Sequence, residues 1–166
     1  KHFDVDCVFD VGANEGQYGQ MLRRVGYRGH IISFEPVPRA LEKLRNNARG
    51  DSKWHVEPIA LDSVARETTF NIMAVDQFSS LNEPSRDEAG DLLAKKNTVA
   101  TKLTVQTATV TQMYDKYREQ LHFERPYLKM DTQGSDLAIA EGAGETLKSF
   151  VGIQSELSIK RLYKGT

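Results

Sequence analysis

Two glycines and several acidic or amide residues gather in a short segment near the start of the chain. Gly12 and Gly16 stand four residues apart, and Asp10 and Asn14 lie beside or between them. Glycine lets the backbone take a positive φ or approach a ligand closely. An apolar run precedes the segment and an amphipathic one follows it, so we predict a strand-to-helix turn whose helix N–H groups can bind an anion. Val8–Gly16 is therefore a candidate ligand-binding loop.

The residues of this loop discriminate among three ligand classes. A phosphate-binding P-loop ends in Gly-Lys-Ser/Thr, whereas this loop reads Glu15-Gly16-Gln17. A dinucleotide fingerprint needs a glycine where Asn14 stands, and the carboxylates of Asp10 and Glu15 would repel a pyrophosphate. Carboxylates suit a ligand with a cationic centre and an amino group, such as S-adenosylmethionine. Its own carboxylate could be bound by N–H groups of the loop or helix.

A second acidic residue supports a nucleoside ligand. Glu35 follows the apolar run 31–34, about 25 residues after Asp10, and Pro36 and Pro38 fix the turn behind it. An acidic side chain at the end of a second strand can accept hydrogen bonds from ribose hydroxyls. Nicotinamide enzymes share this feature, so an NAD-dependent oxidoreductase with a Rossmann fold stays an alternative, as does a fold fragment without catalytic activity. The combination with Asp10 favours the sulfonium cofactor.

Three further carboxylates stand at or just beyond predicted strand ends, namely Asp131, Asp136 and Glu156. Methyl transfer to a hydroxyl benefits from a group that accepts the proton. We predict this role for Asp131 and Glu156, whereas Asp136 or its neighbour Ser135 is favoured as a helix cap. Oxygen ligands could also hold magnesium, but acidic clusters are weak metal signals and a metal site is not predicted.

The elements that position these residues follow from the hydrophobic pattern. Strands and helices alternate from the start, which predicts an α/β fold with a doubly wound, mostly parallel sheet in one domain, residues 1–166. Strands are predicted at 5–11, 31–34, 54–61, 68–73, 102–110, 127–130 and 150–156. Helices are predicted at 17–25 and 39–48, after a Thr111 N-cap and from 135 to 140, with a short one near 86–95. Trp54 is expected in the core.

Composition narrows the classes of protein. The 166 residues carry a formal net charge of −1 and 27% charged residues without a basic block, so no nucleic-acid partner is expected. The chain has one cysteine and no stretch of about 18 apolar residues, which excludes an internal disulfide and predicts no integral membrane segment. The four histidines show no zinc spacing. We expect a cytoplasmic protein.

Several runs in order along the chain resemble the FkbM-type methyltransferases. The runs are VFDVGANEGQYG, ISFEPVPRALEKLRNN, PIALD, SSL, VQTATV and YLKMDTQGSD. The resemblance extends from Asp6 to Tyr163. It implies a class I, Rossmann-like methyltransferase that uses S-adenosylmethionine, mostly on hydroxyl oxygens of sugars, polyketides and related compounds. It also implies a final antiparallel hairpin after Glu156, so we expect the domain to be incomplete at its C-terminus.

The resemblance also implies roles for individual residues. The methionine part of the cofactor is expected beside Asp10, Gly12, Ala13, Asn14 and Gly16. Glu35 would hold the ribose, and the adenine would lie near Pro36, Ala60, Leu61 and Asp62. Met130 and Asp131 would close the cleft from the strand at 127–130.

Overall fold

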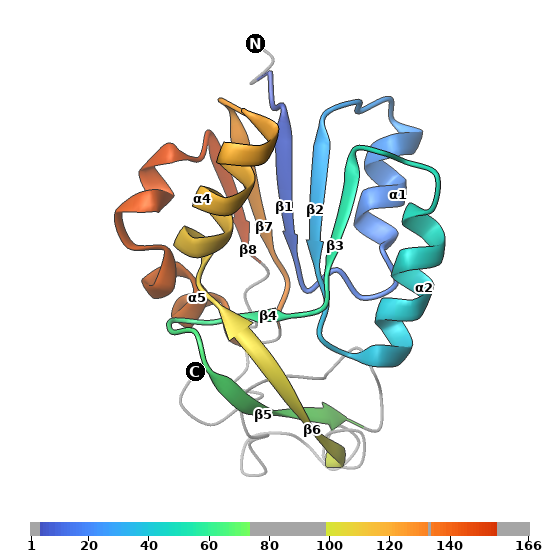
Figure 1. The fold of residues 1–166 in the computed structure, drawn as a ribbon, viewed down its shortest axis with the longest axis vertical. Coiled ribbons are helices and arrows are strands. Elements are labelled where there is room, and N and C mark those ends of the chain that lie inside the picture. Colours follow the sequence, from blue (N-terminus) through green and yellow to red (C-terminus); the bar gives the residue numbers. More distant parts are fainter. Residues whose placement is uncertain (1–3, 74–98, 133, 156–166) are drawn as a thin grey trace.

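A computed structural model describes residues 4–73, 99–132 and 134–155. Its centre is a five-stranded, fully parallel sheet in the order β3-β2-β1-β7-β8 (Figure 1). The strands are β1 (Cys7–Val11), β2 (His30–Phe34), β3 (Trp54–Glu57), β7 (Pro126–Met130) and β8 (Gly152–Ser155). Parallel strands buried on both faces read as continuous apolar runs, which is why CVFDV and HIISF were recognisable in the sequence. The predicted α/β class with a parallel sheet is confirmed.

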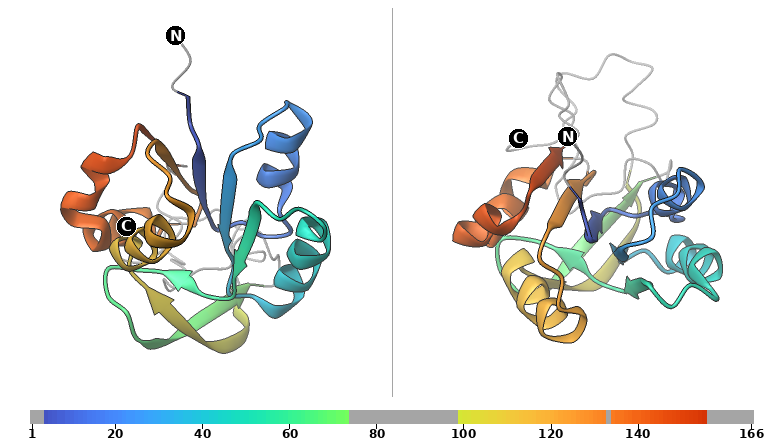
Figure 2. Two further views of the ribbon diagram at one scale, coloured as in Figure 1. Left: turned by 45° about the horizontal axis from the view of Figure 1, so that its top comes forward. Right: turned by 90° about the horizontal axis from the view of Figure 1, so that it is seen from above.

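Helices cover both faces of this sheet (Figure 2). Helices α1 (Gln17–Arg24) and α2 (Pro38–Ala48) pack on one face, and α4 (Val110–Leu121) and α5 (Asp136–Ala143) on the other, with a 3₁₀ turn η2 (Gly144–Ser149) after α5. The sheet has a hydrophobic cluster on each face, and neighbouring residues of β2 belong to different clusters. Ile31 packs with Leu44 and Trp54, whereas Ile32 belongs to the cluster that contains Phe9 and Ile139. Among the described helices, none is long and apolar enough to span a bilayer.

A small second sheet lies below the carboxyl ends of β1, β2 and β3 in Figure 1. It contains β4 (Ala60–Leu61), β6 (Val99–Ala108) and β5 (Glu67–Met73) in that order, with β4 parallel and β5 antiparallel to β6. The prediction of one strand over 54–61 is therefore wrong. β3 ends at Glu57, and Pro58, which has no N–H to donate, separates it from β4 in the other sheet.

The start of α4 differs from the prediction by two residues. Thr109 is the N-cap, and its hydroxyl accepts from the Gln112 N–H while the Gln112 side chain accepts from the Thr109 N–H, a complete capping box. Because the helix begins at Val110, β6 ends at Ala108 and not at 110. Thr111, the predicted cap, instead donates from its hydroxyl toward the carbonyls of Gly142 and Ala143, which ties α4 to α5. The predicted short helix near 86–95 lies outside the described residues.

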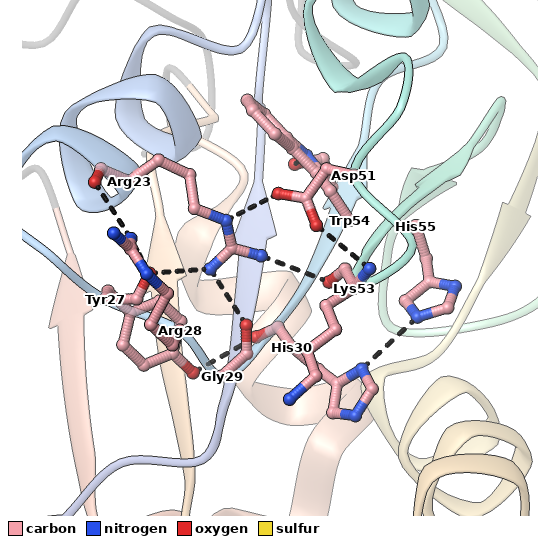
Figure 3. Close-up of polar contacts among 10 residues, drawn as sticks. Arg23, Tyr27, Arg28, Gly29, His30, Asp51, Lys53, Trp54 and His55 are labelled. Atoms are coloured by element: carbon pink, nitrogen blue, oxygen red, sulfur yellow. Dashed lines mark hydrogen bonds and ion pairs between the residues drawn. The ribbon is translucent and has the colours of Figure 1, made fainter.

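One guanidinium fastens α1 to the amino ends of its neighbouring strands (Figure 3). Arg23, in the last turn of α1, donates 2.6 Å to Asp51 Oδ2 and 2.9 Å to the carbonyl of Gly29. It also donates to the carbonyls of Tyr27 and Lys53. These bonds hold the carboxyl end of α1 against the turns that precede β2 and β3, so the amino end of the helix has a fixed position beside the loop after β1.

Candidate functional site

A cavity of about 580 Å³ opens at the carboxyl ends of β1, β2 and β7, where ligands bind in open α/β sheets. Most of the residues predicted for the site contribute to its lining. They are Gly12, Ala13, Asn14, Glu35, Pro36, Ala60, Leu61, Met130 and Asp131. The cavity therefore brings together residues from both sheets, from Val11 to Gln154, that are up to 143 positions apart in the chain.

Three described residues predicted for the site do not line the cavity. Asp10 is fully buried behind the cavity wall. Gly16 has a φ of 90°, and a Cβ there would lie 2.7 Å from a methyl carbon of Leu44, so this glycine permits close packing of the loop on α2. Asp62 forms a 2.8 Å ion pair with Arg66 and is not among the lining residues. Glu156 lies outside the described residues.

The loop after β1 is held by its own backbone. Gly12 has a φ of 72°, and a Cβ on it would lie 2.1 Å from the carbonyl oxygen of Asp131, so only glycine fits between β1 and β7 here. The N–H groups of Gly12 and Ala13 both donate to the carbonyl of Phe34, at 3.2 and 3.1 Å. The Gly16 N–H donates to the carbonyl of Ala13 at 2.8 Å. The loop is thus preorganised, and these three donors are already engaged.

Glu35 forms part of the cavity wall and braces two turns. Its Oε2 accepts a 2.8 Å bond from the Asn14 N–H, and its Oε1 accepts a 2.8 Å bond from the Val37 N–H. Burial raises the pKa of Glu35 to about 7, although both backbone hydrogen bonds oppose the rise. Each carboxylate oxygen has a second lone pair. Glu35 could therefore accept from ribose hydroxyls without giving up its backbone partners.

Lys129 is a site residue that the sequence analysis missed. It lies opposite Asp10 in the β1–β7 register, and its Nζ is 3.0 Å from Asp10 Oδ1 and 3.7 Å from Asp131 Oδ2. The ammonium also lies 3.4 Å from the Gly12 carbonyl oxygen and 5.5 Å from the ring centre of Tyr18. Burial raises the pKa of Asp10, and the charge of Lys129 opposes that rise.

Asp10 also begins a buried polar chain that leads away from the cavity. The Ser33 hydroxyl donates 3.3 Å to Asp10 Oδ2, and the Trp54 indole N–H donates 3.0 Å to the Ser33 oxygen. Trp54 is buried, as predicted, and its ring lies against Gly19 of α1. Asp10 therefore supports the loop from behind through Lys129 and Ser33.

Because β2 and β7 lie on opposite sides of β1, the cavity has two ends, which differ in chemistry. One is mainly apolar and is lined by Phe34, Pro36, Val37, Ala40, Leu61 and Phe70. The other is polar and is lined by Tyr18, Lys129, Asp131, Thr132, Ser135 and Gln154. Glu35 and Asn14 stand among the lining residues as well. Such a cavity fits a ligand with a flat apolar base, a ribose and a charged amino-acid portion, which are the parts of S-adenosylmethionine.

Comparison with known protein families matches residues 10–159 to the methyltransferase FkbM domain. The chain belongs to the FkbM methyltransferase family. A similar protein is the 2-O-methyltransferase NoeI of Sinorhizobium fredii (strain NBRC 101917 / NGR234), which is 23% identical over 163 residues. The match covers 95% of this chain and 65% of NoeI, so the chain spans less than two thirds of that relative. No solved structure matches significantly.

At the polar end of this FkbM domain, Asp136 ties two strand ends together. Its Oδ1 accepts from the backbone N–H and the hydroxyl of Thr132, and its Oδ2 accepts from the hydroxyl of Ser155. Ser135 occupies the N-cap of α5 without a side-chain capping bond. The carboxylate of Asp136 is thus a brace between the loop after β7 and the end of β8.

Asp131 is the more exposed carboxylate of the polar end, with 35% of its side chain accessible. In the described part of the chain, no three His, Cys, Asp or Glu side chains are arranged to hold a metal ion. Asp131 is therefore the predicted proton acceptor that the structure locates at the cavity. The sequence signal for its neighbour Lys129 was a lysine within the apolar run 127–130, aligned with an aspartate on the adjacent strand.

Proposed function

We propose that this chain is the catalytic domain of an S-adenosylmethionine-dependent methyltransferase that methylates a hydroxyl oxygen of a small molecule or glycoside. The observation that carries the proposal is the cavity at the carboxyl ends of the parallel strands, apolar at one end and charged at the other, with Glu35 on its wall. Membership of the FkbM family supports the reaction class.

The protein does not need to activate the methyl group itself. When bound, S-adenosylmethionine supplies a methyl group already activated on a sulfonium, and the sulfur keeps the electron pair of the broken bond. Asp131 takes the proton from the substrate hydroxyl while the hydroxyl oxygen forms a bond to the methyl carbon. The loop at Gly12 and the small sheet at Phe70 hold the donor in place and exclude water, which favours in-line transfer.

A polyhydroxylated acceptor is expected beside the cofactor's amino-acid portion, at the polar end of the cavity. Thr132, Ser135 and Gln154 offer neutral donors and acceptors, and Tyr18 offers a ring face beside the Lys129 ammonium. Hydroxyl, amide and aromatic groups together match a sugar, which has many hydroxyls and apolar faces. The 2-O-methyltransferase activity in the name of NoeI is in keeping with this acceptor class.

Calorimetric titration tests the proposal without knowledge of the acceptor. The protein is expected to bind S-adenosylhomocysteine and not NAD, and NAD binding without the homocysteine ligand would refute the proposal. Glu35→Ala should weaken S-adenosylhomocysteine binding about 10- to 100-fold, as expected for loss of hydrogen bonds to a charged group. Glu141→Ala, at an exposed position of α5, is the matched control and should bind as the wild type does.

A further inference from the structure

The amino-acid portion of the proposed cofactor is a zwitterion, and its carboxylate needs a donor. Loop N–H groups are the usual expectation after a glycine-rich turn. Here the N–H groups of Gly12 and Ala13 donate to the Phe34 carbonyl, and that of Asn14 donates to Glu35. A carboxylate could use them only by displacing bonds that shape the loop. These loop donors are engaged, so a charged side chain on another wall of the cavity is a stronger candidate for the carboxylate than they are.

Lys129 is the one positively charged side chain among the described residues that line the cavity. Its ammonium carries three N–H donors. One donates to the Gly12 carbonyl at 3.4 Å, and the 3.0 Å ion pair with Asp10 Oδ1 engages at most a second. The 3.7 Å separation from Asp131 Oδ2 is an ion pair beyond hydrogen-bond length. One N–H of the ammonium is thus left without a hydrogen-bond acceptor in the described part of the chain.

We propose that Lys129 binds the α-carboxylate of the cofactor's amino-acid portion, with Asp10 as the buried anion that holds Lys129 in place. This inference rests on the proposed function, because it assigns a subsite within the same cavity. Charges would then alternate from Asp10 to Lys129 to the carboxylate. A charge-assisted bond of this kind is about twice as strong as a neutral one.

The sharpest test compares two ligands that differ only in the carboxylate. S-adenosylhomocysteine and its decarboxylated analogue, which keeps the amino group, are titrated calorimetrically into the wild type and Lys129→Met. The wild type should prefer the carboxylate-bearing ligand about 10- to 100-fold. Lys129→Met should bring that preference to within about threefold. Lys116→Met, which removes an ammonium from α4 and not from the cavity, should keep the wild-type preference.

The design separates this inference from structural damage and from failure of the proposed function. Lys129→Met leaves Asp10 buried without its partner, so Asp10→Asn/Lys129→Met is measured as well, because it removes both charges together. A preference that survives in either folded variant overturns the subsite, and so does a wild type that binds both ligands equally. Wild-type protein that binds neither ligand refutes the proposed function instead. Equal weakening of both ligands, with the preference intact, would show that Lys129 only supports the loop.

Discussion

Glu35 is predicted to make the protein less stable as the pH rises, which is unusual for a carboxylate. Only 6% of the residue is exposed, and burial raises its pKa from 4.5 to about 7. Between those two pH values the folded state binds more protons at Glu35 than the unfolded state does. The free energy of unfolding therefore falls as the pH rises, which is opposite to the behaviour of a carboxylate stabilised by a salt bridge. The full change corresponds to about 3 kcal/mol, at about 1.4 kcal/mol for each pH unit.

Glu35→Gln removes this titration and keeps the shape of the side chain. The amide oxygen can accept from the N–H of Asn14 or of Val37 but not easily from both, so the variant loses about 1–3 kcal/mol at every pH. The unfolding free energy of Glu35→Gln, relative to that of the wild type, should then rise by about 2–3 kcal/mol between pH 5 and pH 8. The gain is the measurable quantity, because the loss of the hydrogen bond cancels from it.

Urea unfolding of both proteins at pH 5, 6, 7 and 8 measures the gain. Glu141→Gln, an exposed carboxylate on α5, is the control and should differ from the wild type by a constant amount. Other titrating groups act equally on wild type and variant and so cancel. If the difference between Glu35→Gln and wild type varied by less than about 0.5 kcal/mol over this range, Glu35 would titrate normally and the burial argument would be wrong.

Three further predictions concern the frame around the site. Gly19→Ala should lower the unfolding free energy by about 1–3 kcal/mol, because its Cβ would lie 2.2 Å from Trp54 Cζ2. Helix propensity alone would favour alanine by about 1 kcal/mol. A variant that is more stable in urea than the wild type would contradict this packing. Thr109→Ala should lower the unfolding free energy by about 1 kcal/mol through loss of the capping box. An unchanged urea midpoint would show that Thr109 does not stabilise α4 in this way. Burial lowers the pKa of His30 and His55, whose ring nitrogens lie 3.4 Å apart (Figure 3), so stability should fall as the pH drops below 6.5. His55→Gln should flatten that fall, and parallel pH profiles would exclude the pair as its cause.

The fold could be predicted to the extent that burial leaves a pattern in the sequence. Strands β1 and β2 are buried on both faces and therefore read as mainly apolar runs, interrupted by Asp10 and Ser33, between glycine and proline signals. The boundary at Pro58 was missed because Ile59–Leu61 continues the apolar run into a different sheet. The cap at Thr109 had a local signal, the spacing to Gln112, that Thr111 does not share.

The site could be predicted only where a residue's position along the chain decides its contacts. Loop residues such as Gly12 and Asn14 line the cavity because the turn after β1 places them there. Lys129 and Phe70 could not be assigned in this way, since their neighbours come from other strands and depend on sheet register and on the position of the small sheet. A lysine within an apolar strand was itself the clue, because burial of such a charge requires a partner.

The structure changes the physical argument for the ligand. The sequence alone predicts two negative charges, from Asp10 and Glu15, where a pyrophosphate would lie. In the fold, Asp10 is buried and its charge is balanced by Lys129, while Glu15 forms an ion pair with Lys43 of α2. Repulsion by these two carboxylates therefore no longer separates a sulfonium ligand from a dinucleotide. The distinction passes to the FkbM family match, because an ammonium such as that of Lys129 attracts a pyrophosphate as well as a carboxylate. An ammonium at the base of the cleft suits the carboxylate of an amino acid, and the two-ligand titration measures that preference directly.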